Sequence, residues 1–182
     1  HIIKEKKAWP NQILCVTFTN KASREMQNRI ASFLDEKISS LPWLGTFHSV
    51  SAKLLRRHAE AVGLNSRFTI IDQEDQLRLI KNICKVENID TKKISPQFIL
   101  AFINWWKNKG LLPNDVIAKK NLPLEKNILL IYKYYQERLK ILNSCDFGDL
   151  ILHCVVMFEN SPDILELYAK NFKYILVDEY QD

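Results

Sequence analysis

The stretch FKYILVDEYQD (residues 172–182) joins an apolar run to two acidic residues and points to the fold class. Residues 172–177 are short and apolar, a pattern that predicts a buried strand. Asp178 and Glu179 follow at once, at the end of a strand where open α/β sheets bind their ligands. In phosphate-transfer proteins the first carboxylate holds Mg²⁺ and the second orients or deprotonates a water. An ordinary solvent-exposed strand end is the alternative reading of the same two residues.

The N-terminal part of the chain predicts further strands of this sheet. QILCVTF (residues 12–18) has the pattern of a buried strand, and Asn20 is a suitable cap for the helix that follows. A short strand over residues 44–46 leads into a helix over about residues 47–62, which Gly63 ends. Strand–helix–strand at the start and a strand at the end together predict one α/β sheet.

The stretch between these strands is almost entirely helical in pattern. A short strand is expected over residues 68–71, and helical periodicity dominates from there on. This block is therefore expected to be inserted into the sheet. Its helices are expected to begin at Asp72, Ser95-Pro96, about residue 124, residue 146 and Ser161-Pro162.

Composition excludes several classes of protein. The chain has 182 residues, 47% of them hydrophobic and 26% charged, as a soluble globular protein has. It has only four glycines, none within ten residues of another, so neither G-x-G-x-x-G nor G-x-x-x-x-G-K-[ST] occurs in these residues. The four cysteines form no C-x-x-C pair, which argues against a zinc site and for reduced thiols. With no apolar run of membrane-spanning length, a cytoplasmic protein is expected.

Three further blocks carry side chains that could bind a polyanion such as a nucleic acid, and the net charge of +5 favours the same kind of partner. After the first predicted strand, Phe18 could stack on an unpaired base, and the polar side chains that follow it could meet a phosphate. GTFHS (residues 45–49) offers hydrogen-bond donors at a strand-to-helix junction. NWWKNK (residues 104–109) mixes aromatic and basic side chains. Core aromatics, a helix cap and a solvated basic face are the plainer explanations.

Taken together and in this order, the blocks resemble the N-terminal part of UvrD-like (UvrD/Rep/PcrA) superfamily 1 DNA helicases. The resemblance runs along essentially the whole chain. It rests on ILCVTFTNKASREM (motif Ia), LGTFHSVSAKLLRRHA (motif Ib), FTIIDQEDQLRLIK (motif Ic), CDFGDLIL (motif Id) and ILVDEYQD (motif II). Gly148 departs from the acid or alanine that often stands at its place in motif Id.

The resemblance implies a domain organisation. Residues 1–46 and 172–182 would belong to a RecA-like motor domain, called 1A, with a partial parallel sheet of the P-loop NTPase type whose phosphate loop is missing. Residues 47–171 would form the mostly helical inserted subdomain 1B, whose first boundary could lie as late as about residue 72.

The resemblance also assigns roles to individual residues. Asp178 and Glu179 would hold Mg²⁺ through ATP, Glu179 would be the catalytic base and Gln181 would couple nucleotide to movement. Single-stranded DNA would contact Phe18, Thr19, Asn20, Lys21, Thr46, Phe47 and His48. Trp106, Lys107 and Lys109 are further candidates for a DNA contact.

The implied activity is ATP-dependent, 3′-to-5′ unwinding of DNA in repair or replication, on single strands and single-strand/duplex junctions, with repair or replication proteins as partners. The chain itself is expected to be a fragment that binds neither ATP nor Mg²⁺ and hydrolyses no ATP, because the Walker A loop and the motifs after motif II are not in these residues. Two alternatives stay open: a fragment of a RecB/AddA-type helicase–nuclease, and a binding module for DNA or protein that has no motor.

Overall fold

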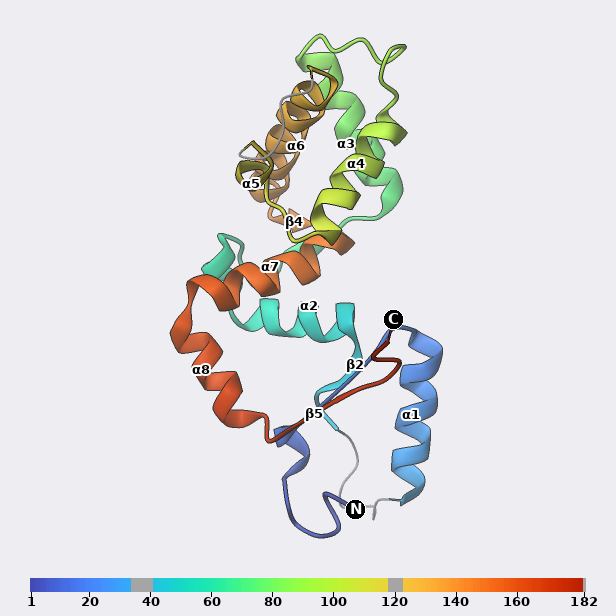
Figure 1. The fold of residues 1–182 in the computed structure, drawn as a ribbon, viewed down its shortest axis with the longest axis vertical. Helices are drawn as coiled ribbons and strands as arrows, with labels where there is room; N and C mark the ends of the chain where they lie inside the picture. The colour runs from blue at the N-terminus through green and yellow to red at the C-terminus, as the bar shows by residue number, and fades with distance from the viewer. Residues whose placement is uncertain (34–40, 118–122, 182) are drawn as a thin grey trace. The chain divides into compact units, whose positions relative to one another are not determined.

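The computed structural model describes residues 1–33, 41–117 and 123–181 of the chain (Figure 1). Their contacts divide the chain into two compact units. The first, which we call the sheet unit, comprises His1–Leu54 and Met157–Asp182, and the second, the helical unit, comprises Leu55–Val156. Helices α2 (Phe47–Arg57) and α7 (Phe147–Asn160) run across the two boundaries. The molecule is thus mixed α/β, with small parallel sheets and mostly helices.

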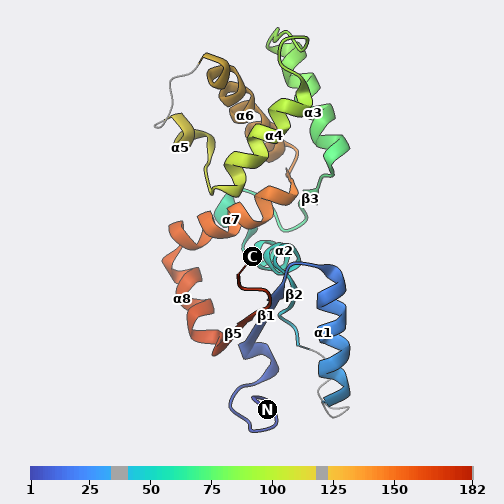
Figure 2. The same ribbon diagram turned by 45° about the vertical axis from the view of Figure 1, so that its right-hand side comes forward.

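The sheet unit contains a parallel sheet of three strands in the order β2-β1-β5 (Figure 2). These strands are β1 (Ile13–Thr17), β2 (Leu44–Thr46) and β5 (Tyr174–Val177). Helix α1 (Asn20–Phe33) follows β1, as the sequence predicts. The middle strand β1 is buried at four of its five positions, which explains its continuous apolar sequence.

Aromatic side chains from distant parts of the sequence pack together in the sheet unit. The ring centroids of Trp43 and Phe172 lie 5.4 Å apart, and Tyr168 of helix α8 (Pro162–Asn171) lies 5.8 Å from Trp43. Ala8, Ile13, Cys15 and Leu44 form a second buried cluster. The residues before β1 make hydrogen-bonded turns and a 3₁₀ turn at Pro10–Gln12.

The helical unit has its own core among α3 (Gln73–Val86), α4 (Pro96–Asn108) and α6 (Pro123–Ile141). Their apolar faces meet in a cluster in which Ile80, Ile103 and Tyr135 are completely buried. The short helix α5 (Pro113–Ile117) packs on α6. Two two-residue strands, β3 (Thr69–Ile70) and β4 (Ser144–Cys145), pair in parallel.

Most expected helix starts are confirmed, with local differences. The Asp72 and Ser95 side chains accept hydrogen bonds from the backbone N–H groups of Asp75 and Phe98, as N-caps do. At α1, however, the capping side chain is Thr19 rather than Asn20, since Thr19 Oγ1 accepts from Ala22 N at 3.0 Å.

The helix expected over residues 47–62 is interrupted. Helix α2 ends at Arg57, and a separate 3₁₀ helix covers Ala59–Val62. His58, between them, has φ −132° and ψ 32°, which is outside the helical region. Gly63 ends the 3₁₀ segment with φ +72°, as its expected role in ending a helix requires.

All four cysteines are buried, and none of them forms a disulfide bond. Burial raises the pKa of Cys15 to about 11, and burial together with nearby carboxylates raises the pKa of Cys145 to about 12. Both residues are therefore thiols rather than thiolates at neutral pH. None of the helices in the described ranges is long and apolar enough to cross a membrane.

Candidate functional site

Most of the predicted site residues follow strands that end together at one edge of the three-stranded sheet. Thr17 of β1 pairs with Thr46 of β2, and Val16 pairs with Val177 of β5, so the three carboxyl ends are nearly level. The residues that follow therefore gather at this edge, where open parallel sheets bind ligands. They are Phe18 to Lys21 after β1, Phe47 and His48 after β2, and Asp178 and Glu179 after β5.

Two aromatic rings meet at this edge. The centroids of Phe18 and Phe47 lie 5.1 Å apart, with their planes inclined by 49°. Phe18 remains 51% exposed although it directly follows the buried strand β1, and Phe47 is half-buried. An exposed ring held against a second ring is a stable surface on which a base can stack.

Two threonines at the edge begin helices. Thr19 caps α1, and Thr46 Oγ1 accepts a hydrogen bond from Ser49 N at 3.2 Å at the start of α2. The N-termini of both helices thus lie at the same edge, where their amides favour an anion. Asn20 and Lys21 are exposed beside them, and His48 is half-buried.

The two carboxylates after β5 have different environments. The backbone N–H of Asp178 donates to Val16 O at 3.0 Å, which continues the pairing with β1 and fixes the position of Asp178, whose side chain is half-buried. Glu179 is exposed, accepts a hydrogen bond from Gln181 Nε2, and has φ +53°. A left-handed backbone at a residue other than glycine is uncommon and concentrates at functional sites.

The donor set at this edge suits Mg²⁺ bound together with a phosphate. Within the described ranges, no three His, Cys, Asp or Glu side chains are grouped so that they could hold a metal ion by themselves. Mg²⁺ prefers oxygen ligands, and it commonly takes only one or two carboxylates when phosphates supply the rest. Asp178 and Glu179 are such a pair.

Two of the three residues of NWWKNK that were candidates for a DNA contact, Trp106 and Lys107, are buried, so that prediction is wrong for them. Trp106 is 1% exposed and stacks on Tyr132, with ring centroids 5.7 Å apart, and the Lys107 side chain is completely buried. Both side chains face the core of the helical unit, because their positions fall on the buried stripe of α4. Lys109 is exposed, and its contact with DNA stays a prediction.

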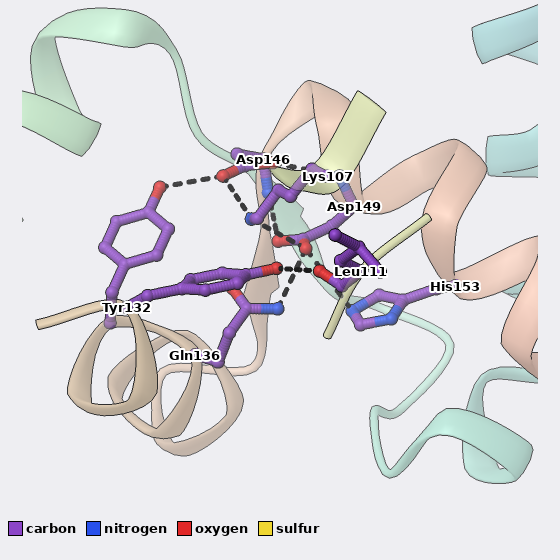
Figure 3. Close-up of polar contacts among 8 residues, drawn as sticks. Lys107, Leu111, Tyr132, Gln136, Asp146, Asp149 and His153 are labelled. Atoms are coloured by element: carbon purple, nitrogen blue, oxygen red, sulfur yellow. Dashed lines mark hydrogen bonds and ion pairs between the residues drawn. The ribbon is translucent and has the colours of Figure 1, made fainter. Parts of the chain in front are cut away.

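Lys107 instead belongs to a buried cluster of charged and polar groups that the sequence did not predict (Figure 3). Its Nζ lies 2.6 Å from Asp146 Oδ2 and 2.7 Å from Asp149 Oδ1. The hydroxyl of Tyr135 donates to Asp146 Oδ2 at 2.9 Å, and Gln136 Nε2 donates to Asp149 Oδ1 at 3.0 Å. Each buried carboxylate thus has a cation and further donors, as burial of a charge requires.

The two aspartates also cap α7. Asp149 N donates to Asp146 Oδ1 at 2.9 Å, and Asp146 N donates to Asp149 Oδ2 at 3.2 Å. These reciprocal bonds form a capping box. The three-residue spacing of Asp146 and Asp149 is the feature of the sequence from which this capping box could have been predicted. Gly148 lies between them, where an added Cβ would come within 3.1 Å of Lys107 Cδ. The close approach of the lysine stem gives this glycine a packing role.

Burial and charge shift the pKa values in this cluster. Burial alone would raise the pKa of Asp149, but the charge of Lys107, helped by His153 and by hydrogen bonds, outweighs it and holds that pKa below its ordinary value. Burial lowers the pKa of His153, against the opposing charge of Asp149. Burial and the two aspartates raise the pKa of Tyr135. Asp149 is therefore ionised at neutral pH, with a neutral His153 beside it.

Comparisons with known proteins give one consistent family. A family model described as the UvrD/REP helicase N-terminal domain matches residues 1–182. The "Probable DNA helicase II homolog" of Rickettsia felis is 46% identical over 185 residues, covering 100% of this chain and 28% of that protein. "ATP-dependent DNA helicase PcrA" of Leuconostoc citreum is 40% identical over 182 residues, covering 100% of this chain and 24% of that protein. The chain spans about a quarter of the length of these relatives.

Proposed function

The chain belongs to the UvrD/REP helicase family, and from this membership we propose that it is the N-terminal part of an ATP-driven DNA helicase that moves 3′ to 5′ on single-stranded DNA. The names of its relatives, a probable DNA helicase II homolog and an ATP-dependent DNA helicase, support the ATP-driven helicase part of this proposal. Its substrates would be single strands and single-strand/duplex junctions in DNA repair or replication, in the cytoplasm, beside the proteins of those pathways.

In this proposal the sheet unit is part of the RecA-like motor domain 1A and the helical unit is subdomain 1B, with boundaries after residues 54 and 156 in place of those expected after residues 46 and 171. Two observations support this assignment. The sheet is parallel, and its first and last strands in the sequence, β1 and β5, are neighbours. The helical unit lies between β2 and β5 in the sequence, where an insertion into domain 1A would lie.

Asp178 and Glu179 would serve the nucleotide. When bound, ATP would supply the phosphoryl group, and Mg²⁺ would neutralise the negative charge that develops on it. Asp178, fixed by its backbone bond to Val16, would hold the metal, and Glu179 would accept a proton from the attacking water. Gln181, in hydrogen-bond contact with Glu179, would couple the nucleotide to movement.

The same edge would bind single-stranded DNA. The exposed ring of Phe18, supported by Phe47, would stack on a base. The helix N-termini capped by Thr19 and Thr46, with Asn20, Lys21 and His48 nearby, would hold phosphates. The single observation that best supports the proposal is that β1, β2 and β5 end at the same edge of the sheet. This edge therefore contains both the residues expected to bind the nucleotide and those expected to bind DNA.

Glu179→Gln in the longer protein that contains this chain tests the nucleotide role. DNA-stimulated ATP turnover should fall by a factor of about 100 or more, because general base catalysis commonly contributes that much. Glu159→Gln, at an exposed acidic residue outside the edge, is the matched control and should keep wild-type turnover. A Glu179→Gln enzyme with unchanged turnover would show that another group activates the water.

A further inference from the structure

Helix α4 carries a row of aromatic side chains on its outer face. Phe98, Phe102, Trp105 and Lys109 are spaced at i, i+4, i+7 and i+11, so they lie along one side of the helix. We call these four residues the aromatic row. The other side of α4 carries the buried residues Ile99, Ile103 and Trp106 and packs into the core. Phe102 is half-buried and packs against this core, whereas Phe98 and Trp105 are exposed.

The rings of the row touch one another and remain accessible. The centroids of Phe98 and Phe102 lie 4.9 Å apart, and those of Phe102 and Trp105 lie 6.4 Å apart. Phe98 and Trp105 are each 43% exposed. Lys109 Nζ lies 4.8 Å from the centroid of the Trp105 ring, so a cation marks one end of the row.

A basic cavity lies at the other end of α4. It has a volume of about 570 Å³, and its lining includes Lys81 and Lys85 of α3 with Thr91, Ser95 and Gln97. Helices α3 and α4 pack side by side in both views (Figures 1 and 2). Gln97 of this lining directly precedes Phe98, so the cavity adjoins the row. Among the described residues that line it, none is acidic.

The stretch of sequence that contains the row carries charges of one sign only. No residue between Asp90 and Asp115 is acidic, and this stretch contains the whole of α4. An apolar protein partner needs no such exclusion of carboxylates, whereas a nucleic acid strand does, because its backbone is negatively charged. Aromatic rings that run along a basic groove are the arrangement with which proteins bind single strands without reading their sequence.

We propose that the aromatic row and the lysine cavity form a second binding surface for single-stranded DNA, separate from the edge of the sheet. Bases stack on Phe98 and Trp105, and phosphates contact Lys81, Lys85 and Lys109. The choice of DNA as the ligand rests on the proposed function, and the surface itself rests on the geometry of α3 and α4. An intact helicase would thus hold unpaired DNA on its helical unit as well as on its motor.

Stacking is tested with an oligothymidylate of about 20 nucleotides, whose binding to the chain is followed by fluorescence anisotropy. Trp105→Ala should weaken binding about fivefold to tenfold, and Trp105→Phe should restore most of the affinity because it keeps a ring. Ile141→Ala, at an exposed apolar residue of α6 outside the row, is the control and should bind as wild type does. Equal affinity of Trp105→Ala and wild type overturns the proposal.

The phosphate contacts have their own signature in the dependence on salt. For single strands, each phosphate contact adds about 0.7 to the slope of log K against log salt concentration. Replacing both lysines, Lys81→Gln with Lys85→Gln, should therefore reduce this slope by about 1.4, whereas Trp105→Ala should leave it unchanged. A slope that the double variant does not alter shows that the cavity holds no phosphate and overturns that half of the proposal.

Phe18→Ala at the edge of the sheet separates this inference from the proposed function. If Phe18→Ala weakens binding and Trp105→Ala does not, the second surface is wrong and the proposed function stands. If the wild-type chain does not bind the oligonucleotide at all, both fail. If Trp105→Ala changes the sedimentation of the chain and not its affinity for DNA, the row is a contact between protein chains and the proposal is overturned.

Discussion

Lys107 is the residue for which the prediction from the sequence differs most from the structure. By pattern it stands in a basic and aromatic tract, yet it lies buried between two carboxylates that are 39 and 42 positions further along the chain. No local rule predicts that pairing, because it depends on how α4 packs against the start of α7. The residues at the edge of the sheet could be predicted because each directly follows a strand with a recognisable apolar pattern.

Replacing Lys107 should be costly. Lys107→Met leaves Asp146 and Asp149 buried without their cation, and loss of one partner from a buried ion pair typically costs about 3–5 kcal/mol. Urea denaturation followed by circular dichroism measures this loss. Lys109→Met, two residues along the same helix and exposed, should cost less than about 1 kcal/mol. Equal stability of the two variants would contradict the role of the buried cluster.

His153 should make the stability depend on pH. Because burial lowers its pKa in the folded state, the unfolded chain binds the proton more readily below its ordinary pKa of about 6.5. The contribution of His153 is therefore complete above that pH and is lost as the pH falls from there toward the folded-state pKa. His153→Gln should reduce the fall in the free energy of unfolding between pH 7 and 5.5 by on the order of 1 kcal/mol.

The same urea titrations, repeated at both pH values, provide the measurement. His1→Gln, at an exposed histidine, is the control and should keep the wild-type dependence. Identical pH dependence in His153→Gln and wild type would show that other groups cause the acid sensitivity. Asp149 acts in the same direction at lower pH, because its depressed pKa adds stability that is lost as it becomes protonated below about pH 4.

At the scale of elements, sequence patterns located the longer helices, and among the strands of the described residues they missed only β4. The Ser-Pro pairs at residues 95–96 and 161–162 both mark helix starts, since Pro96 and Pro162 begin α4 and α8. Strand β4 has only two residues, too few to show a periodicity, and it forms because Asn143 and Cys145 accept backbone hydrogen bonds from Thr69 and Ile71. Such a strand depends on its partner rather than on its own sequence.

The two Ser-Pro starts allow a matched comparison of capping. Ser95 Oγ accepts a hydrogen bond from Phe98 N at 3.2 Å, whereas Ser161 makes no side-chain capping bond. Ser95→Ala should therefore cost about 1 kcal/mol, and Ser161→Ala should cost close to nothing. Thermal denaturation of both variants gives the comparison. A greater loss in Ser161→Ala would contradict the capping geometry.

At the scale of the whole molecule, each of the two units contains a buried apolar cluster. The core of α3, α4 and α6 shares no residue with the cluster around β1. Lys107→Met should therefore speed hydrogen exchange in α4 and α6 and leave the exchange of β1 amides nearly unchanged. Hydrogen exchange read by mass spectrometry resolves these segments. An equal acceleration in β1 would show that the two units open as one.

The buried cysteines give each unit a chemical reporter of its own opening. Cys15 lies in the sheet unit, and Cys84, Cys145 and Cys154 lie in the helical unit. A water-soluble disulfide reagent can reach a buried thiol only while the surrounding structure is open, so its rate of reaction measures how often that structure opens. Mapping which cysteine reacts first would rank the two units by local stability, with no residue changed.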